Sequence, residues 1–129
     1  MVIDSSAIMA ILLGEPEELA FVELIGAAET RLMSPINLVE THIVCFGRKR
    51  EAGVRELQAF LNAAQITIAS IEPAQANLAR DAFDRYGKGR HPAALNLGDC
   101  FAYALSKTSG EPLLFKGADF AKTDVVAAL

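Results

Sequence analysis

The sequence predicts an α/β fold in which a short parallel sheet of four to five strands is covered by helices on both faces. Short apolar segments alternate with longer amphipathic ones, as expected for strands that are connected by helices. No internal repeat, linker or low-complexity stretch divides the chain, and 52% of its 129 residues are hydrophobic. We therefore expect one domain that spans residues 1–129 and buries a core of its own.

The first half of the chain predicts two strands and four helices. The strands are expected at residues 1–3 and 31–33, and the helices at residues 7–13, 17–28, 35–50 and 52–64. Ser34 and Pro35 supply the N-cap residue and the first-turn proline with which the third helix begins. Apolar side chains lie almost all round the helix at 35–50, so we expect this helix to be buried.

The second half predicts two more strands and two more helices. The strands are expected at residues 66–69 and 112–115, and the helices at residues 73–86 and 96–108. Between these helices, residues 87–92 contain two glycines, a proline and three potential cations, which predicts a flexible and locally basic loop.

The balance of charges excludes a protein that coats nucleic acid without specificity. Twelve Lys and Arg against sixteen Asp and Glu give a formal net charge of −4, so any contact with nucleic acid must be local. The longest apolar run, at residues 7–13, is far shorter than the roughly 20 residues that span a bilayer. We expect a cytoplasmic protein without membrane contact, in which Cys45 and Cys100 are small buried side chains rather than a disulfide.

Two acidic residues follow predicted strands at the place where a ligand site is expected. Asp4 comes directly after the first strand, and Asp119 lies in the turn after the last strand. In open parallel sheets, ligands bind beyond the carboxyl ends of the strands. Taken singly, each residue is also explained as a cap or a turn residue, because Asp favours both positions.

Two further acids lie on predicted helices. Asp99 stands three residues after Asn96, a spacing that also predicts a capping box at the start of the last helix. Glu40 lies in the middle of the most apolar helix, and no Lys or Arg stands one turn away to pair with it. Burial of an unpaired carboxylate is costly, so another group must neutralise Glu40.

A divalent cation that all four acids bind resolves this conflict, because clustered carboxylates repel one another until a cation compensates their charge. Hard oxygen ligands select Mg²⁺ or Mn²⁺. Without these four residues the chain has twelve acidic and twelve basic side chains, so the net charge of −4 equals the charge of the predicted site. The sequence therefore predicts an anionic metal site on an otherwise neutral protein.

Four segments of the chain resemble PIN-domain ribonucleases of the VapC toxin family. They are residues 2–7 (VIDSSA), the helix that contains Glu40, residues 95–105 (LNLGDCFAYAL) and residues 114–120 (LFKGADF). The resemblance extends over essentially the whole chain, and the last two segments are its most specific motifs. It implies a Rossmann-like three-layer fold and endonucleolytic cleavage of RNA at a Mg²⁺ or Mn²⁺ site. It also implies a homodimer and inhibition by a VapB-type antitoxin, with DNA contacted only through the antitoxin complex.

Residue by residue, the acidic quartet of the family falls on Asp4, Glu40, Asp99 and Asp119, and its small hydroxyl residue falls on Ser6. Asp4 and Asp99 are then expected to be the central metal ligands. Glu40 and Asp119 are expected to complete the shell directly or through water, and one of them to orient the nucleophile. Ser6 is expected to hydrogen-bond to a ligand carboxylate.

Other charged residues near these motifs are candidates for supporting roles. Lys88 and Arg90 in the basic loop, together with Lys116 beside the last acid, are candidates for binding the RNA phosphates, and for each of them a solvated surface charge is the alternative. Asp124 follows the last motif and either joins the site behind the metal ligands or occupies a turn.

The helices predicted at residues 7–13 and 17–28 are strongly apolar, and two interpretations stay open for them. They either cover the core or present an apolar groove to a partner helix. The resemblance favours an antitoxin bound at this groove, with an antitoxin Arg that reaches into the acidic site.

Two other classes of protein fit the sequence less well than a nuclease. A response-regulator receiver domain also places aspartates around Mg²⁺, but here serines follow Asp4 and no aspartate follows the strand predicted at 66–69. A dinucleotide-binding module or a P-loop protein requires a glycine-rich turn that the chain lacks. The remaining alternative is a PIN-fold domain that binds RNA or a partner without cleaving it.

Overall fold

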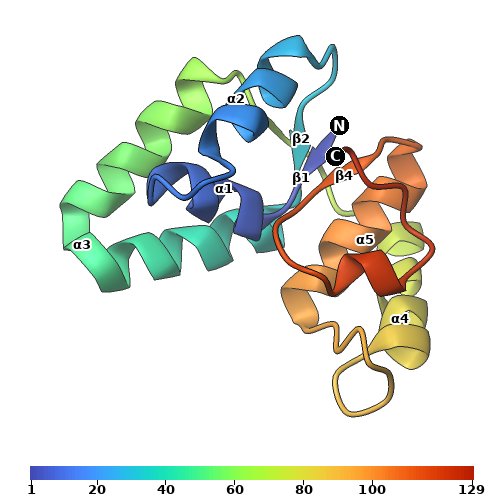
Figure 1. The fold of residues 1–129 in the computed structure, drawn as a ribbon. Coiled ribbons are helices and arrows are strands. Elements are labelled where there is room, and N and C mark those ends of the chain that lie inside the picture. The colour runs from blue at the N-terminus through green and yellow to red at the C-terminus, as the bar shows by residue number, and fades with distance from the viewer.

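At the centre of the structure, a computed structural model that describes residues 1–129, short parallel strands form one four-stranded sheet (Figure 1). The strands are β1 (Val2–Ile3), β2 (Leu32–Met33), β3 (Thr67–Ile68) and β4 (Leu113–Leu114). Their order across the sheet is β3-β2-β1-β4, and all neighbouring strands are parallel. Each observed strand lies within a predicted one, so the parallel sheet is confirmed.

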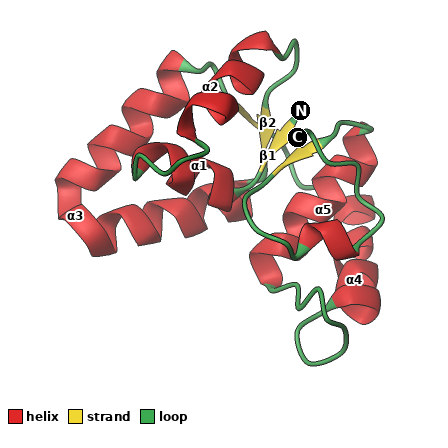
Figure 2. Ribbon diagram, viewed as in Figure 1, coloured by secondary structure: helices red, strands yellow, loops and turns green.

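The helices cover both faces of this sheet, as Figure 2 shows, and the three-layer α/β architecture is therefore confirmed. They are α1 (Ser5–Leu12), α2 (Glu18–Ala27), α3 (Pro35–Ala63), α4 (Pro73–Tyr86) and α5 (Leu97–Ser109). Ile3 and Met33 point into the core beneath the first three helices. Val2 and Leu113 point into a second core beneath α4 and α5. Alternate strand residues thus serve opposite layers, as the pleat of a sheet requires.

Helix α3 consists of two arms that meet at a sharp bend (Figure 1). Lys49 and Arg50 have non-helical backbone angles, and the positive φ of Arg50 (51°) redirects the chain. The arms approach so closely after the bend that a Cβ at Gly53 would lie 2.3 Å from the backbone oxygen of Cys45. This bend coincides with the break that the sequence predicts between the helices at 35–50 and 52–64.

The expectation that the helix at 35–50 is buried was wrong. Val39 and Ile43 have exposed fractions of 56% and 64%, whereas the fully buried positions of this arm are the polar residues Asn37 and Thr41. The reason is that α1 and α5 pack against one side of the arm and no element covers the other. In this protein, apolar residues all round the helix therefore belong to a helix that leaves one apolar face exposed.

The sheet order creates a switch point between β1 and β4, because the chain leaves β1 toward β2 on one side and later returns on the other. Asp4 follows β1, and its backbone N–H donates to the carbonyl of Leu114 in β4 over 2.9 Å. The ends of both strands are thus held together at this point. None of the helices combines the length and the apolar character needed to cross a membrane.

Candidate active site

Asp4 lies at the carboxyl end of β1 and is almost fully buried. Its Oδ2 accepts hydrogen bonds from the backbone N–H of Ser6 (2.9 Å) and from Ser6 Oγ (2.6 Å), so Asp4 is also the N-cap of α1. Burial raises the pKa of this carboxyl, the bonds from Ser6 oppose that rise, and the charge of Glu40 adds to it. Asp4 therefore serves both as the N-cap of α1 and as a residue of the candidate site.

Ser6 connects Asp4 to the loop that carries the last acid. While its hydroxyl donates to Asp4, its oxygen accepts the backbone N–H of Lys116 over 2.9 Å. The loop then leads to Asp119, which is exposed and precedes the 3-10 helix η1 (Phe120–Lys122). Ser6 thus makes the contact with a site carboxylate that the resemblance implies for its position; its part in catalysis stays a prediction.

Asp99 lies in the first turn of α5 and forms the predicted capping box with Asn96. Its Oδ2 accepts from the backbone N–H of Asn96 over 3.0 Å, and its own N–H donates to Asn96 Oδ1 over 2.9 Å. Burial raises the pKa of Asp99 to about 6, and the charges of Asp4, Glu40 and Asp119 add to that rise. The other three predicted acids therefore lie close enough to Asp99 for their charges to act on it.

Glu40 reaches the same place from α3. Its Oε1 accepts a hydrogen bond from Ser5 Oγ over 2.6 Å. Its carboxylate lies against Gly98, where an added Cβ would be 2.5 Å from Oε2. No base compensates Glu40, because neither it nor any other member of the quartet forms an ion pair.

Three residues that pattern reasoning missed hold this group of acids together: Ser5, Asn37 and Gly98. Asn37 is fully buried, and its Nδ2 lies 3.1 Å from the carbonyl of Gly98 and 3.5 Å from Asp4 Oδ1. The signal for Asn37 was its position one helical turn before Glu40 on the same face of α3. Ser5 and Gly98 each stand directly beside an acid of the quartet.

The side chains fit a divalent cation in their chemistry, although they are not yet gathered around one point. As the side chains stand, no three His, Cys, Asp or Glu residues are close enough together to hold one metal ion. However, the donors are hard carboxylate oxygens of the kind that Mg²⁺ and Mn²⁺ select. The raised pKa of Asp99, to which burial contributes most and the other three acids also contribute, reports a repulsion that a cation would relieve.

Asp124 does not belong to this group, which corrects its assignment as a residue that supports the site. Tyr103 donates to Asp124 Oδ1 over 2.6 Å, and Lys107 and Arg85 form ion pairs with Oδ2 at 3.2 Å and 3.6 Å. The hydrogen bond from Tyr103 is the main cause that lowers the pKa of Asp124. The residue anchors the C-terminal segment to α5.

The cations predicted to bind RNA differ in their surroundings. Lys116 forms ion pairs with Glu15 and, at 3.2 Å, with Glu17, so two acids of the turn between α1 and α2 already neutralise it. Lys88 and Arg90 are exposed in the loop between α4 and α5, where Arg90 Nε donates to a backbone carbonyl over 3.3 Å. Of the three candidates, Lys88 and Arg90 are thus the two that form no ion pair with an acid.

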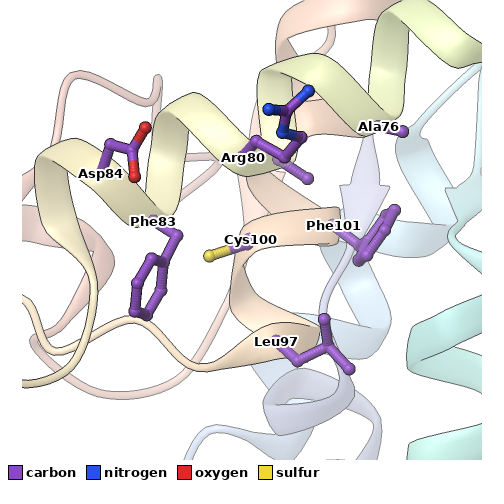
Figure 3. A pocket seen from close by; sticks show the side chains of 8 residues that line it. Ala76, Arg80, Phe83, Asp84, Leu97, Cys100 and Phe101 are labelled. Atoms are coloured by element: carbon purple, nitrogen blue, oxygen red, sulfur yellow. The ribbon is translucent and has the colours of Figure 1, made fainter.

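Leu97 lines two mainly apolar hollows, of which one borders the acids. One has a volume of about 450 Å³ and lies against Glu40 and Gly98, so it leads to the acid group. The other, of about 570 Å³, lies between α4 and α5 and is mainly apolar; Phe83, Cys100 and Phe101 are among the side chains that line it (Figure 3). Its single acid, Asp84, is not one of the four.

Comparisons with known proteins agree with the fold. The PIN-domain family model matches residues 1–126. The chain is 49% identical over 127 residues to a ribonuclease VapC of Mycolicibacterium smegmatis, with 98% of both chains covered. It is 48% identical over 125 residues to ribonuclease VapC30 of Mycobacterium tuberculosis, covering 97% of this chain and 95% of the relative.

Two solved structures share the fold at low sequence identity. VapC20 of Mycobacterium tuberculosis, described as a toxin that cleaves the sarcin-ricin loop, gives a TM-score of 0.74 at 16% identity and covers 97% of this chain and 95% of its own. VapBC2 of Rickettsia felis, bound to a DNA fragment from its promoter, gives 0.74 at 15% identity and covers 98% and 94%. The chain therefore belongs to the PIN-domain family and, within it, to the VapC proteins.

Proposed function

We propose that this protein is a Mg²⁺- or Mn²⁺-dependent endoribonuclease and the toxin of a VapBC-type toxin–antitoxin module. The observation that carries this proposal is geometric: Asp4 is buried at the carboxyl end of β1, Glu40 lies against Gly98 beside Asp99, and the amide of Asn37 connects Gly98 with Asp4. Acids from separate parts of the chain thus come together at the switch point of the sheet, and none of them forms an ion pair with a base. Relatives named ribonuclease cover almost the whole chain.

Asp4 and Asp99 are the proposed central ligands of the cation, and Glu40 and Asp119 complete its surroundings directly or through water. A bound divalent cation supplies positive charge next to the phosphate and makes water more acidic. Glu40 borders the open hollow, so it is well placed to orient a water molecule toward the phosphorus atom. Ser6 keeps Asp4 in place through two hydrogen bonds. The expected products are a 5′-phosphate and a 3′-hydroxyl, without participation of the ribose 2′-hydroxyl.

The RNA is proposed to run past the loop between α4 and α5. Lys88 and Arg90 are exposed there without an acidic partner, so their charges are available for phosphate oxygens. Lys116 lies nearer to Asp119 in the sequence but is held by Glu15 and Glu17. We therefore assign the larger share of phosphate binding to the loop.

A VapB-type antitoxin is the proposed partner of the surface formed by α1 and α2. Most apolar residues of these helices belong to the core, but Leu13, Leu19 and Val22 remain exposed, with 76% of Leu19 accessible. An amphipathic helix of the antitoxin would cover them. Co-expression of the adjacent small gene tests this partner: the two products are expected to purify together, and Leu19→Asp to separate them.

A second copy of the chain is the proposed partner of the exposed face of α3. This face carries Val39 and Ile43, and Leu97 protrudes beside it with 69% of its side chain accessible. Leu97 lines both hollows. A copy related by a twofold axis would therefore present its own Leu97 and its own hollows to this surface. Light scattering is expected to show a dimer for the wild type and a monomer for Ile43→Asp.

Cleavage of a cellular RNA pool separates this proposal from a PIN-fold domain that only binds RNA. Wild type with Mg²⁺ is expected to cleave, whereas Asp4→Asn with Mg²⁺ and wild type with EDTA are not. Asp81→Asn, an exposed acid of α4, is the matched control and should cleave like the wild type. If the wild type binds RNA without cleaving it, the result would favour a PIN-fold domain that only binds RNA. Cleavage that survives both Asp4→Asn and EDTA would contradict the proposal.

A further inference from the structure

Asn37 is a polar side chain in an unusual place, because it is fully buried and touches three elements of the fold. Its Nδ2 lies 3.1 Å from the carbonyl of Gly98 in α5, 3.3 Å from Ser5 Oγ in α1 and 3.5 Å from Asp4 Oδ1 at the end of β1. Asn37 itself belongs to α3, one turn before Glu40. A single amide group therefore spans the segments that carry Asp4, Glu40 and Asp99.

The orientation of this amide follows from its partners. A backbone carbonyl only accepts hydrogen bonds, so the nitrogen of Asn37 must face Gly98. Its Oδ1 is then left buried without any partner. An unsatisfied buried oxygen destabilises the folded state, and an apolar side chain of the same shape avoids that cost. Stability alone does not explain an asparagine here.

The backbone of Asn37 strengthens the same connection. Ser5 Oγ lies 3.2 Å from the carbonyl oxygen of Asn37 and donates to Glu40 Oε1 over 2.6 Å. Movement of Asn37 would therefore disturb the hydroxyl that orients Glu40 as well as the carboxylate of Asp4. Thr41, also buried, donates to the Asn37 carbonyl over 2.7 Å and fixes it from within α3.

We propose that Asn37 is a positioning residue that holds Asp4, Glu40 and the Gly98–Asp99 turn at the spacing needed to bind a divalent cation. It does not itself contact the reacting atoms. Its amide fixes two of the acid-bearing segments directly, and Glu40 through Ser5. The inference rests on the proposed nuclease function of the same acids.

Asn37→Leu tests this role, because leucine has a similar shape but cannot donate to Gly98 or Asp4. The kcat for RNA cleavage is expected to fall by about 10- to 100-fold, as for other residues that orient metal ligands. The KM for RNA should stay within about twofold, since the cations that bind phosphate are untouched. The Mn²⁺ concentration that gives half of the rise in melting temperature should increase by about 10- to 100-fold.

Gln75→Leu is the matched control. Gln75 is likewise a buried amide with an unpartnered oxygen, but it belongs to α4 and its Nε2 lies 3.5 Å from the carbonyl of Ser70, away from the acids. Its replacement should leave kcat and the response to Mn²⁺ unchanged. If Asn37→Leu fails to fold by circular dichroism, Asn37→Ser carries the same expectation, because its short hydroxyl cannot span from α3 to Gly98.

The result that overturns the proposal is a folded Asn37 variant whose kcat and Mn²⁺ response equal those of Gln75→Leu. An equal loss in both variants also overturns it, because any buried amide would then have the same effect. Failure of the nuclease function itself is recognised separately, since wild type would then not cleave RNA in a manner that depends on Asp4.

Discussion

Glu40 and Gly98 are in contact across α3 and α5, and the contact leaves no room for a side chain at residue 98. An added Cβ would stand 2.5 Å from Glu40 Oε2 and 2.8 Å from Oε1. Asp99 is the next residue, so this contact determines how close two acids of the quartet come to each other. The glycine is needed because the Glu40 carboxylate occupies the space beside it.

Gly98→Ala is therefore expected to push the Glu40 carboxylate away and to lower RNA cleavage by on the order of 100-fold, the typical cost of misplacing a catalytic group by about 1 Å. Gly47→Ala is the control, because Gly47 lies on α3 with Glu40 and a Cβ there would meet no atom within 4 Å. It should keep full activity and gain about 0.4–1 kcal/mol of stability. Equal activity of both variants would show that the contact is irrelevant.

Glu40→Gln is expected to stabilise the metal-free protein and to reduce the further stabilisation that metal gives. In EDTA the melting temperature should rise by a few degrees, because the variant removes one of the charges that repel Asp4 and Asp99. With Mn²⁺ the additional rise should be smaller than in the wild type, since a ligand is lost. Differential scanning calorimetry measures both. A lower melting temperature in EDTA would mean that the hydrogen bond from Ser5 outweighs the repulsion.

The pKa of Asp99 predicts how the stability of the metal-free protein depends on pH. Burial and the neighbouring acids raise this pKa from 3.8 to about 6. Between these values the folded state binds more protons than the unfolded state, so the free energy of unfolding should fall as pH rises from about 4 to about 6 and then level off. Urea unfolding in EDTA should show this fall in the wild type and a weaker one in Asp99→Asn. Identical curves would contradict the shift.

The same carboxyl must lose its proton to bind a cation. Mn²⁺ affinity is therefore expected to decrease as pH falls below about 6, the pKa of Asp99. Measurement of the Mn²⁺-induced rise in melting temperature at a series of pH values tests this point. If that rise stays constant as the pH falls from about 6 to about 4, near the ordinary pKa of an aspartate, the result would argue against Asp99 as a ligand.

The cations of the loop are expected to contribute more to RNA binding than Lys116. Replacing both Lys88 and Arg90 by Ala should raise KM and lower the salt dependence of binding by about 0.7 in log–log slope for each lost phosphate contact. Lys116→Ala should change KM less, because Glu15 and Glu17 already neutralise its charge. Arg55→Ala, an exposed cation of the second arm of α3, serves as the control. A larger change in KM for Lys116→Ala than for the loop variant would indicate that the RNA runs past Lys116 instead of past the loop.

The fold class and the order of elements were predictable because the strand segments are short and apolar and the helix ends carry clear signals. Pro73 begins α4 and Tyr86 ends it, as predicted. The burial of α3 was not predictable, since periodicity does not tell which side of an apolar helix receives a neighbour. The two arms pack on α1 through residues such as Cys45, while Ile43 faces outward.

The four acids were predictable for a different reason. Each stands at a strand end or a helix start, except Glu40, whose lack of a partner in an apolar helix was itself the signal. Asn37 and Ser5 escaped notice because asparagine and serine have many local roles, and only the three-dimensional contacts show that they reach across elements. Asp124 followed the pattern of a supporting acid, yet Tyr103 and Lys107 hold it elsewhere.

Calorimetric titration with Mn²⁺ is the most direct measurement of whether the quartet forms one cation site. The wild type should bind Mn²⁺, Asp4→Asn and Asp99→Asn should abolish the heat of binding, and Glu40→Gln and Asp119→Asn should weaken it. Wild-type affinity in all four variants would contradict the account, because the ion would then be bound elsewhere or not specifically at all.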